Sequence, residues 1–97
     1  MSPPSTPDLN SRVQRREDVP WKVLDDTVII LDLKEGDFFE LDEVAARIWN
    51  GLDGVRTIEE LARALVDQYG IDIETARSDV IAFVSDLYAK GLVVFAD

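Results

Sequence analysis

The stretch that decides the fold is TVIILDLKEGDFFELD, residues 27–42. Residues 27–33 are mostly β-branched or aliphatic, which is typical of a buried central strand. Lys34-Glu35-Gly36 then predicts a hairpin loop, because glycine adopts the positive φ that such loops use. Asp37-Phe38-Phe39-Glu40-Leu41 returns as the next strand, and Asp42 is suited to cap a helix. We therefore expect a hairpin that leads directly into a helix.

Working outward, residues 21–24 form a further short strand, joined through a turn at Asp25-Asp26, where aspartate bonds to its own backbone. Three helices are expected after the strands. The first follows Asp42, the second starts with a capping box between Thr57 and Glu60, and the third is capped by Asp72 and extends to Lys90. A short apolar tail at residues 92–95 is expected to pair or pack back. Strands followed by helices predict an α+β fold with a three-stranded antiparallel meander.

The domain is expected to cover residues 20–97. Residues 1–19 are rich in Pro, Ser, Asn and Arg and show no apolar period, so we expect them to be a disordered arm. At 97 residues the chain fits one domain with a small core. No apolar run reaches the roughly 20 residues of a membrane span. The absence of cysteine fits a cytoplasmic protein.

The composition argues against catalysis and against nucleic acid as a partner. The chain has no histidine and no cysteine, so thiolate nucleophiles, the usual general base and zinc sites built on these residues are excluded. The formal charge is −10, and all of it lies outside residues 1–18, where acids and arginines balance. Such acidity repels a phosphate backbone and attracts a basic or amphipathic peptide. We expect no enzyme, cofactor or metal.

The third strand of the meander is a candidate binding edge. Side chains alternate along a strand, so Phe39 and Leu41 share one face and Phe38 and Glu40 the other. Leu41 leads into the first helix, so its face is expected to be the core face, with Phe38 left partly exposed. A free edge carries unpaired N–H and C=O groups and invites an added strand. The alternative is that Asp37 and Glu40 only guard this edge against aggregation.

The third helix carries two apolar stripes, which together span more than the usual apolar face of a surface helix. One stripe holds Ile73, Ala76, Val80, Phe83 and Leu87, and the second holds Ile81, Val84 and Tyr88 with Arg77 on its line. Either the helix lies centrally and buries both stripes, or the second stripe lines a groove that awaits an apolar partner. The sequence alone leaves both possibilities open.

Other candidate sites are weaker. Asp25-Asp26 and Asp42-Glu43 are paired carboxylates, but adjacent residues in turns and caps seldom converge on one metal ion. The connection at residues 55–57 between the first two helices permits a helix-turn-helix interpretation. Glu59, Glu60 and Asp67 make that region unfavourable for DNA.

Residues 28–42 resemble the family of the pyrroloquinoline-quinone biosynthesis protein D. The likeness continues through five further segments in the same order and spacing, and covers about residues 20–95. These segments are residues 46–49, 52–54, 57–61, 79–83 and 87–93. One difference is Asp42, where the family usually has asparagine; both residues cap helices.

The resemblance implies a winged-helix-like domain that recognises precursor peptides of ribosomally made, modified natural products. In that family the precursor's leader adds a strand to the third strand and docks against the third helix, and an enzyme then acts on the peptide. Carried over, this predicts peptide-binding residues Asp37, Phe38, Phe39, Glu40, Leu41, Arg77, Ile81, Val84 and Tyr88. The implied enzyme partner is a radical S-adenosylmethionine enzyme or a lasso-pathway leader peptidase, with the lasso pathway slightly favoured.

Two alternatives remain. The fold also permits an acidic winged-helix regulator of transcription, or another protein-interaction module. An exposed edge strand would also allow a weak edge-to-edge dimer beside the monomer.

Overall fold

The computed structural model describes residues 7–96. The elements, in chain order, are β1 (Arg12–Arg15), β2 (Trp21–Leu24), β3 (Thr27–Asp32), β4 (Asp37–Leu41), α1 (Glu43–Asn50), β5 (Asp53–Thr57), α2 (Ile58–Tyr69), α3 (Ile73–Ala89) and β6 (Val93–Phe95). The predicted α+β class and the three helices are confirmed. The strands form two separate three-stranded sheets, where the sequence predicted one.

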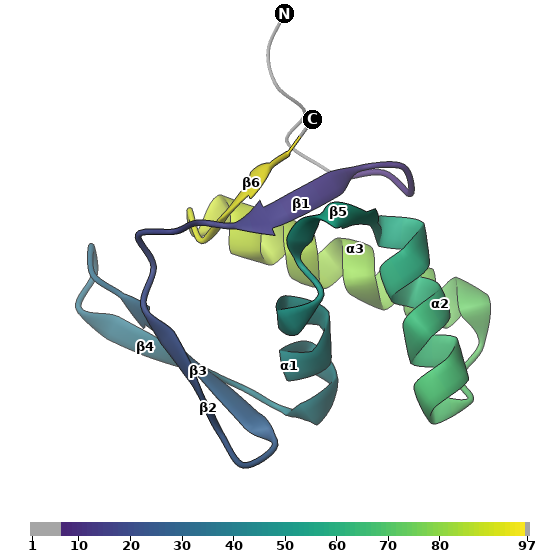
Figure 1. The fold of residues 1–97 in the computed structure, drawn as a ribbon, viewed down its shortest axis with the longest axis horizontal. Coiled ribbons are helices and arrows are strands. Elements are labelled where there is room, and N and C mark those ends of the chain that lie inside the picture. Colours follow the sequence, from purple (N-terminus) through teal and green to yellow (C-terminus); the bar gives the residue numbers. More distant parts are fainter. Residues whose placement is uncertain (1–6, 97) are drawn as a thin grey trace, which may run out of the picture.

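The first sheet is the predicted antiparallel meander, in the order β2-β3-β4. Its two turns use the residues expected, because Asp25 has φ 57° and Gly36 has φ 72°. The register pairs Ile30 with Phe39 and Val28 with Leu41, so these side chains share one face. Val28 and Ile30 are fully buried on that face. Figure 1 shows α1 on one side of this sheet and no further layer on its other side.

The second sheet, in the order β5-β1-β6, corrects the expectation of a disordered arm. Residues 12–15 form its central strand, paired with β5 on one side and β6 on the other. Val13 is 2% exposed, and the guanidinium of Arg15 donates to the carbonyl oxygens of Trp49 and Asn50 at the end of α1. The arm has no apolar period of its own, so its order depends on partners distant in sequence. Residues 1–6 lie outside the described residues.

The helices begin where the caps predicted. Asp42, Thr57 and Asp72 are the N-caps of α1, α2 and α3, and Thr57 and Glu60 form the full capping box. Two further N–H groups at the start of α2, those of Ile58 and Glu59, donate to carbonyl oxygens just before β1. The N-terminal segment therefore supplies the acceptors that the beginning of a helix lacks.

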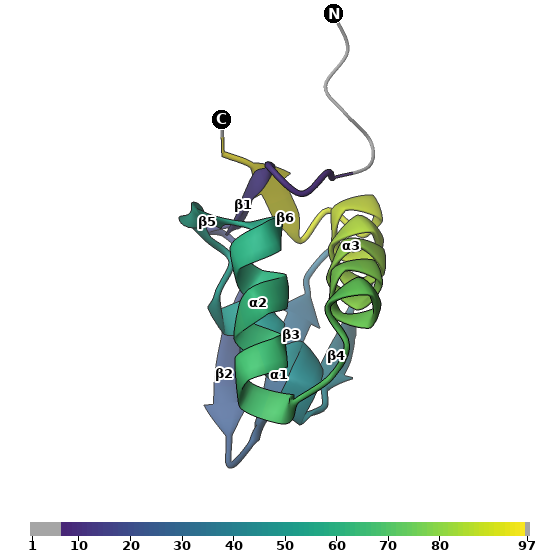
Figure 2. The same ribbon diagram turned by 90° about the vertical axis from the view of Figure 1, so that its right-hand side faces the viewer.

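The core lies between the meander and the helix pair α2 and α3, which run beside each other (Figure 2). Trp49 of α1 is fully buried and meets the ring of Trp21 edge-on, with centroids 5.9 Å apart. Strands β1, β5 and β6 lie across the ends of the helices (Figure 1). The tail at residues 92–95 thus pairs back on the domain as β6, as expected.

Candidate functional site

Strand β4 is an edge of the meander. It pairs with β3 along one side, and within residues 7–96 no strand pairs with its other side. The whole length of β4 is matched to β3, from Asp37 opposite Asp32 to Leu41 opposite Val28. The structure therefore presents five ordered residues whose outer edge is available to a further strand.

The hydrogen bonding of β3 shows which backbone groups of β4 point outward. The N–H of Leu31 donates to the carbonyl of Pro20, 2.9 Å away, on the side of β2. In an antiparallel ladder, the N–H and C=O of one residue point the same way. Leu31 therefore faces away from β4, and its partner Phe38 directs its own N–H and C=O outward. Glu40, two residues later, does the same. The N–H and C=O groups of these two residues, which lie about 7 Å apart along the edge, can thus form hydrogen bonds with an added strand.

The side chains of β4 alternate as the sequence predicted. Leu41 is 8% exposed and Phe39 is half-buried on the core face, whereas Phe38 is 63% exposed on the outer face. An added strand would place alternate side chains on these two faces. The side chains of the added strand that lie on the core face would contact Phe39 and the part of α3 beside it.

The side of α3 that faces β4 is fixed by Lys90, the C-cap of the helix. Its ammonium lies 5.6 Å from the centre of the Phe39 ring and 2.7 Å from a carboxylate oxygen of Asp86. At 3.6 residues per turn, Phe83 and Asp79 share this side of the helix. We call these four residues, Asp79, Phe83, Asp86 and Lys90, the facing stripe. None of these four residues was among the site residues predicted from the sequence.

The four helix residues that were predicted to bind peptide lie elsewhere. Val84 is fully buried in the core, so it cannot line an open groove, and that expectation is wrong. The ring of Tyr88 packs on Phe95 of β6, with centroids 5.1 Å apart. Ile81 is half-buried and shares the side of α3 that carries Arg77 and Tyr88. Central placement of α3, the alternative left open by the sequence, is the better description.

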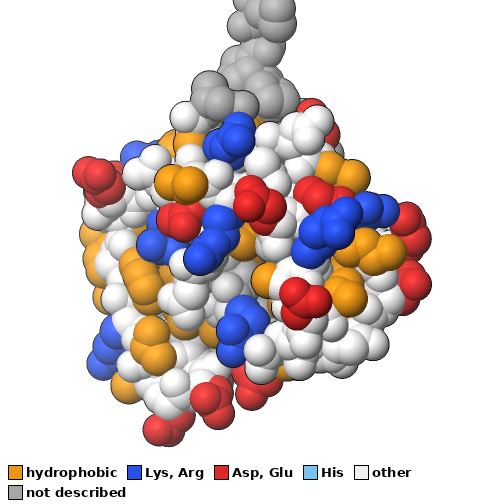
Figure 3. All heavy atoms as spheres, turned by 45° about the vertical axis from the view of Figure 1, so that its right-hand side comes forward, with side chains coloured by type: hydrophobic (Ala, Val, Ile, Leu, Met, Phe, Trp, Pro, Cys, Tyr) orange, Lys and Arg blue, Asp and Glu red, His pale blue; other side chains and the backbone are white. Residues whose placement is uncertain are grey.

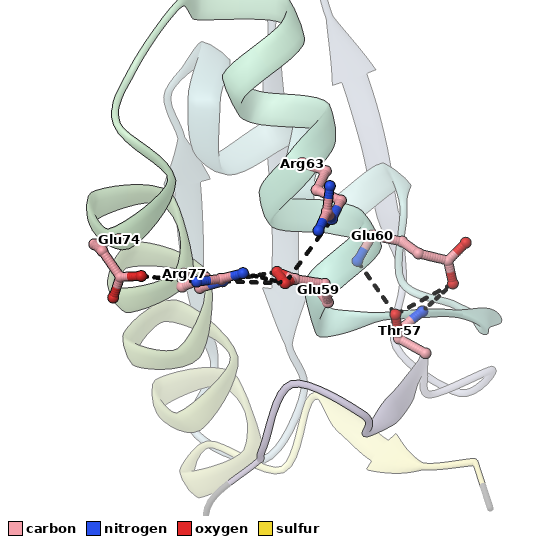
Figure 4. A network of polar contacts seen from close by, with 6 residues as sticks. All are labelled: Thr57, Glu59, Glu60, Arg63, Glu74 and Arg77. Atoms are coloured by element: carbon pink, nitrogen blue, oxygen red, sulfur yellow. Dashed lines mark hydrogen bonds and ion pairs between the residues drawn. The ribbon is translucent and has the colours of Figure 1, made fainter.

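Arg77 is bound to α2 (Figure 4). Its guanidinium donates to both carboxylate oxygens of Glu59, at 2.7 to 3.0 Å, and to Glu74 at 2.7 Å. The hydrogen bonds from Arg77 hold the pKa of Glu59 below its usual value, and the same pair raises the pKa of Arg77. The network fastens α2 to α3 on the side of α3 away from Lys90. Of the nine predicted site residues, the five of β4 lie together at the edge, whereas Arg77, Ile81 and Tyr88 lie on a different side of α3 from the facing stripe.

Knowledge of one long-range contact would have identified the facing stripe. Phe83 belonged to the stripe that the sequence assigned to the core, and Lys90 read only as the residue that ends the helix. Which side of α3 meets β4 depends on contacts with distant elements, among them α2, which is joined to Arg77, and β6, which follows the helix and pairs with β1. No local pattern contains that information.

Apart from the edge of β4, the structure has a cavity at the opposite edge of the meander. This cavity, of about 570 Å³, is bounded by the β2–β3 turn, α1 and α2, with Val23 on its wall and Asp25, Glu43 and Arg47 among its polar residues. Figure 3 shows acidic and basic side chains mixed over the side of the molecule that carries α2, with hydrophobic ones between them. That face offers no continuous basic surface for nucleic acid.

Two classes of site find no support in residues 7–96. No group of three or more acidic side chains there is arranged to hold a metal ion. No helix in that range is both long and apolar enough to cross a membrane.

Comparisons with known proteins agree with this architecture. The family described as coenzyme PQQ synthesis protein D matches residues 27–93. TbiB1, solved in complex with the TbiA(beta) leader peptide, has 32% identity and a TM-score of 0.75, over 82% of this chain and 93% of that one. A comparison with curated proteins found no match.

Two further solved structures show the same fold. Lasso peptide synthetase B1, complexed with the leader peptide, has 23% identity and a TM-score of 0.76, over 86% of this chain and 98% of that one. The PqqD part of Methylobacterium extorquens PqqCD, a stand-alone recognition element, has 19% identity and a TM-score of 0.69, over 84% and 87%.

Proposed function

Because this chain belongs to the family of coenzyme PQQ synthesis protein D, we propose that it recognises the leader of a ribosomally made precursor peptide. The leader forms a fourth strand on β4. The observation that carries this proposal is the outward direction of the backbone groups of Phe38 and Glu40 at an unpaired edge. Main-chain hydrogen bonds supply affinity in this mode of recognition, and side-chain pockets supply specificity.

The inner side chains of the leader would enter the space between Phe39 and the facing stripe. Phe39 offers apolar surface there, and Lys90 and Asp86 offer charge. By helical spacing, Phe83 adds apolar surface and Asp79 adds charge on the same side of α3. Two relatives of this fold are described in complexes with leader peptides, and one of them is a lasso peptide synthetase component. These relatives favour a lasso pathway over a radical S-adenosylmethionine pathway for this chain.

In this role the chain does no chemistry itself. It acts in the cytoplasm and presents the precursor to a modifying enzyme or leader peptidase, which raises the effective concentration of the substrate at that enzyme. The lack of histidine and cysteine throughout the sequence agrees with a binding role. The acidic charge of the domain would speed the approach of a basic leader segment.

Strand addition at β4 can be tested with a proline at Glu40, whose N–H points outward. Glu40→Pro removes an N–H that points away from β3, so the ladder within the meander stays intact, since edge strands tolerate proline at such positions. We expect at least a tenfold loss of affinity for a fluorescein-labelled leader peptide that binds the parent protein, measured by fluorescence anisotropy.

Glu40→Ala is the matched control, because it removes the side chain and keeps the N–H. It should bind the leader within about twofold of the parent protein, since exposed side chains away from special features have small effects. Circular dichroism and the thermal midpoint verify that both variants are folded. Equal leader affinity of the folded Glu40→Pro variant and the parent would refute strand addition at β4.

A further inference from the structure

Backbone pairing alone leaves the register of an added strand undetermined. The outward groups of β4 repeat every two residues, at Phe38 and Glu40, so a leader shifted by two residues makes the same kind of hydrogen bonds. Register is strongly specified only where side chains distinguish one position from another. If the chain binds a leader as proposed above, something beside β4 must select one register.

The charges beside β4 are uneven. Asp37 and Glu40 lie on the strand, and the facing stripe adds Asp79 and Asp86. Among the described side chains of β4 and the facing stripe, Lys90 carries the only positive charge. Its ammonium lies over Phe39, so it reaches from the end of α3 to the inner face of the strand.

A second lysine strengthens the positive charge at this end. The ammonium of Lys34, in the turn before β4, lies 3.8 Å from the position that a Cβ on Gly91 would occupy, just after Lys90. The chain has only three lysines, Lys22, Lys34 and Lys90. Lys34 and Lys90 line one hollow between the β3–β4 turn and the end of α3, together with Asp18 and Asp32. The two lysines thus place the positive charge near β4 at its turn end, where Lys90 already pairs with Asp86, and the rest of the facing stripe is acidic.

We propose that the leader places a carboxylate against Lys90 and that this contact selects the register of the added strand. The residue two positions along the leader, on the same face, then lies over the apolar surface of Phe39 and Phe83. Basic residues of the leader fall toward Asp79, at the far end of the facing stripe. The recognised ligand is thus an extended peptide with an acid at one end of its bound segment and an apolar side chain next to it.

The distances make this selection effective. A slip of two residues moves each leader side chain by about 7 Å, which is less than the Debye length at physiological salt. In one direction the leader carboxylate leaves Lys90 and moves along the facing stripe toward Asp79, where like charges repel. In the other direction it leaves the facing stripe altogether. Each wrong register therefore loses the ion pair, and one of them also gains a repulsion.

The experiment is a charge exchange between protein and leader. Lys90→Glu should weaken binding of the natural leader about fivefold to tenfold, as expected when a partly shielded ion pair becomes a like-charge pair. Each acid in the leader is replaced in turn by lysine. Exactly one of these leaders should lose affinity for the parent protein and regain it with Lys90→Glu. No rescue with any leader, or a natural leader without an acid, would overturn the proposal.

Lys22→Glu is the matched control, because it makes the same change of net charge on β2, at the other edge of the meander. It should change affinity by less than twofold. An equal loss in both variants would mean that only the overall charge matters, and the proposal would fail. Lys90→Gln, which keeps most of the stem without charge, verifies that any loss does not come from a weakened end of α3.

Register is read directly with a spin label. The chain has no cysteine, so a single cysteine in the leader carries the only label in the complex. In the parent protein the label should broaden one set of β4 amide signals, and in Lys90→Glu the broadened set should shift or spread along the strand. A leader that binds the parent but keeps its register in Lys90→Glu refutes this inference alone. A leader that does not bind the parent refutes the proposed function.

Discussion

Val84 shows how one side chain can appear to be a binding residue in the sequence and be core in the structure. It belongs to the second apolar stripe in the sequence pattern, yet it is fully buried in the molecule. Val84→Asp would place an unpaired carboxylate in the core, which costs several kcal/mol against a total stability of about 5–15 kcal/mol. We expect this variant to be unfolded or molten in circular dichroism and thermal melts.

Ala82→Asp is the control, because Ala82 is exposed on the same helix and the substitution adds the same charge. It should keep the fold and shift stability by no more than about 0.5 kcal/mol. A folded, cooperative Val84→Asp protein would contradict the core assignment and return Val84 to the list of surface candidates.

The ion pair between Glu59 and Arg77 makes the stability of the folded state depend on pH. Arg77 holds the pKa of Glu59 below its ordinary value of 4.5, so the pair stabilises the folded state above that pH. The contribution is lost as the pH falls through the pKa that Glu59 has in the folded protein. Glu59→Gln should therefore be less stable than the parent at pH 7, and the difference should shrink below about pH 4.5.

Urea unfolding at a series of pH values measures this difference. Asp67→Asn, which removes an exposed carboxylate of α2 that takes part in no ion pair among the described residues, should leave the difference from the parent small. A Glu59→Gln deficit that stays constant down to pH 3 would show that the carboxylate does not act through its charge.

At the scale of elements, β1 is the least expected part of the fold. Val13→Ala should destabilise the domain by about 2 kcal/mol, because it empties part of a closely packed site between β5 and β6. Glu17→Ala, at an exposed position just after β1, should have little effect. Denaturant unfolding measures both. Equal stability of Val13→Ala and the parent would mean that β1 is not held to the sheet in solution.

Some elements could be predicted from the sequence and others could not. Turns and caps are local, so Gly36, Asp25 and the pair Thr57 and Glu60 predicted their elements directly. β1 and β5 lack an apolar period and gain their order from each other across about forty residues, so no window of sequence reveals them. The β4 half of the site follows from alternation along the strand. The α3 half depends on how the helix is rotated, and that rotation is held by contacts with distant elements such as α2 and β6.

At the scale of the whole molecule, leader binding should stabilise the domain. A ligand that binds only the folded state adds about 2.7 kcal/mol when its free concentration is one hundred times its Kd. For a domain of this size, that should raise the thermal midpoint by more than about 10 °C. A leader with scrambled sequence is the control. An unchanged midpoint under saturating natural leader would contradict binding to the folded domain.

The position of β1 between β5 and β6 also orders events in time. Among the described strands, β1 is synthesised first and is the centre of its sheet, and β6, one of its two neighbours, is synthesised last, at residues 93–95. The meander can pair as soon as β4 emerges, because its contacts are local, whereas the second sheet must wait until residues 93–95 of β6 are free. Contacts that join distant segments slow folding. During synthesis the edge of β4 is therefore formed before the second sheet that completes the domain.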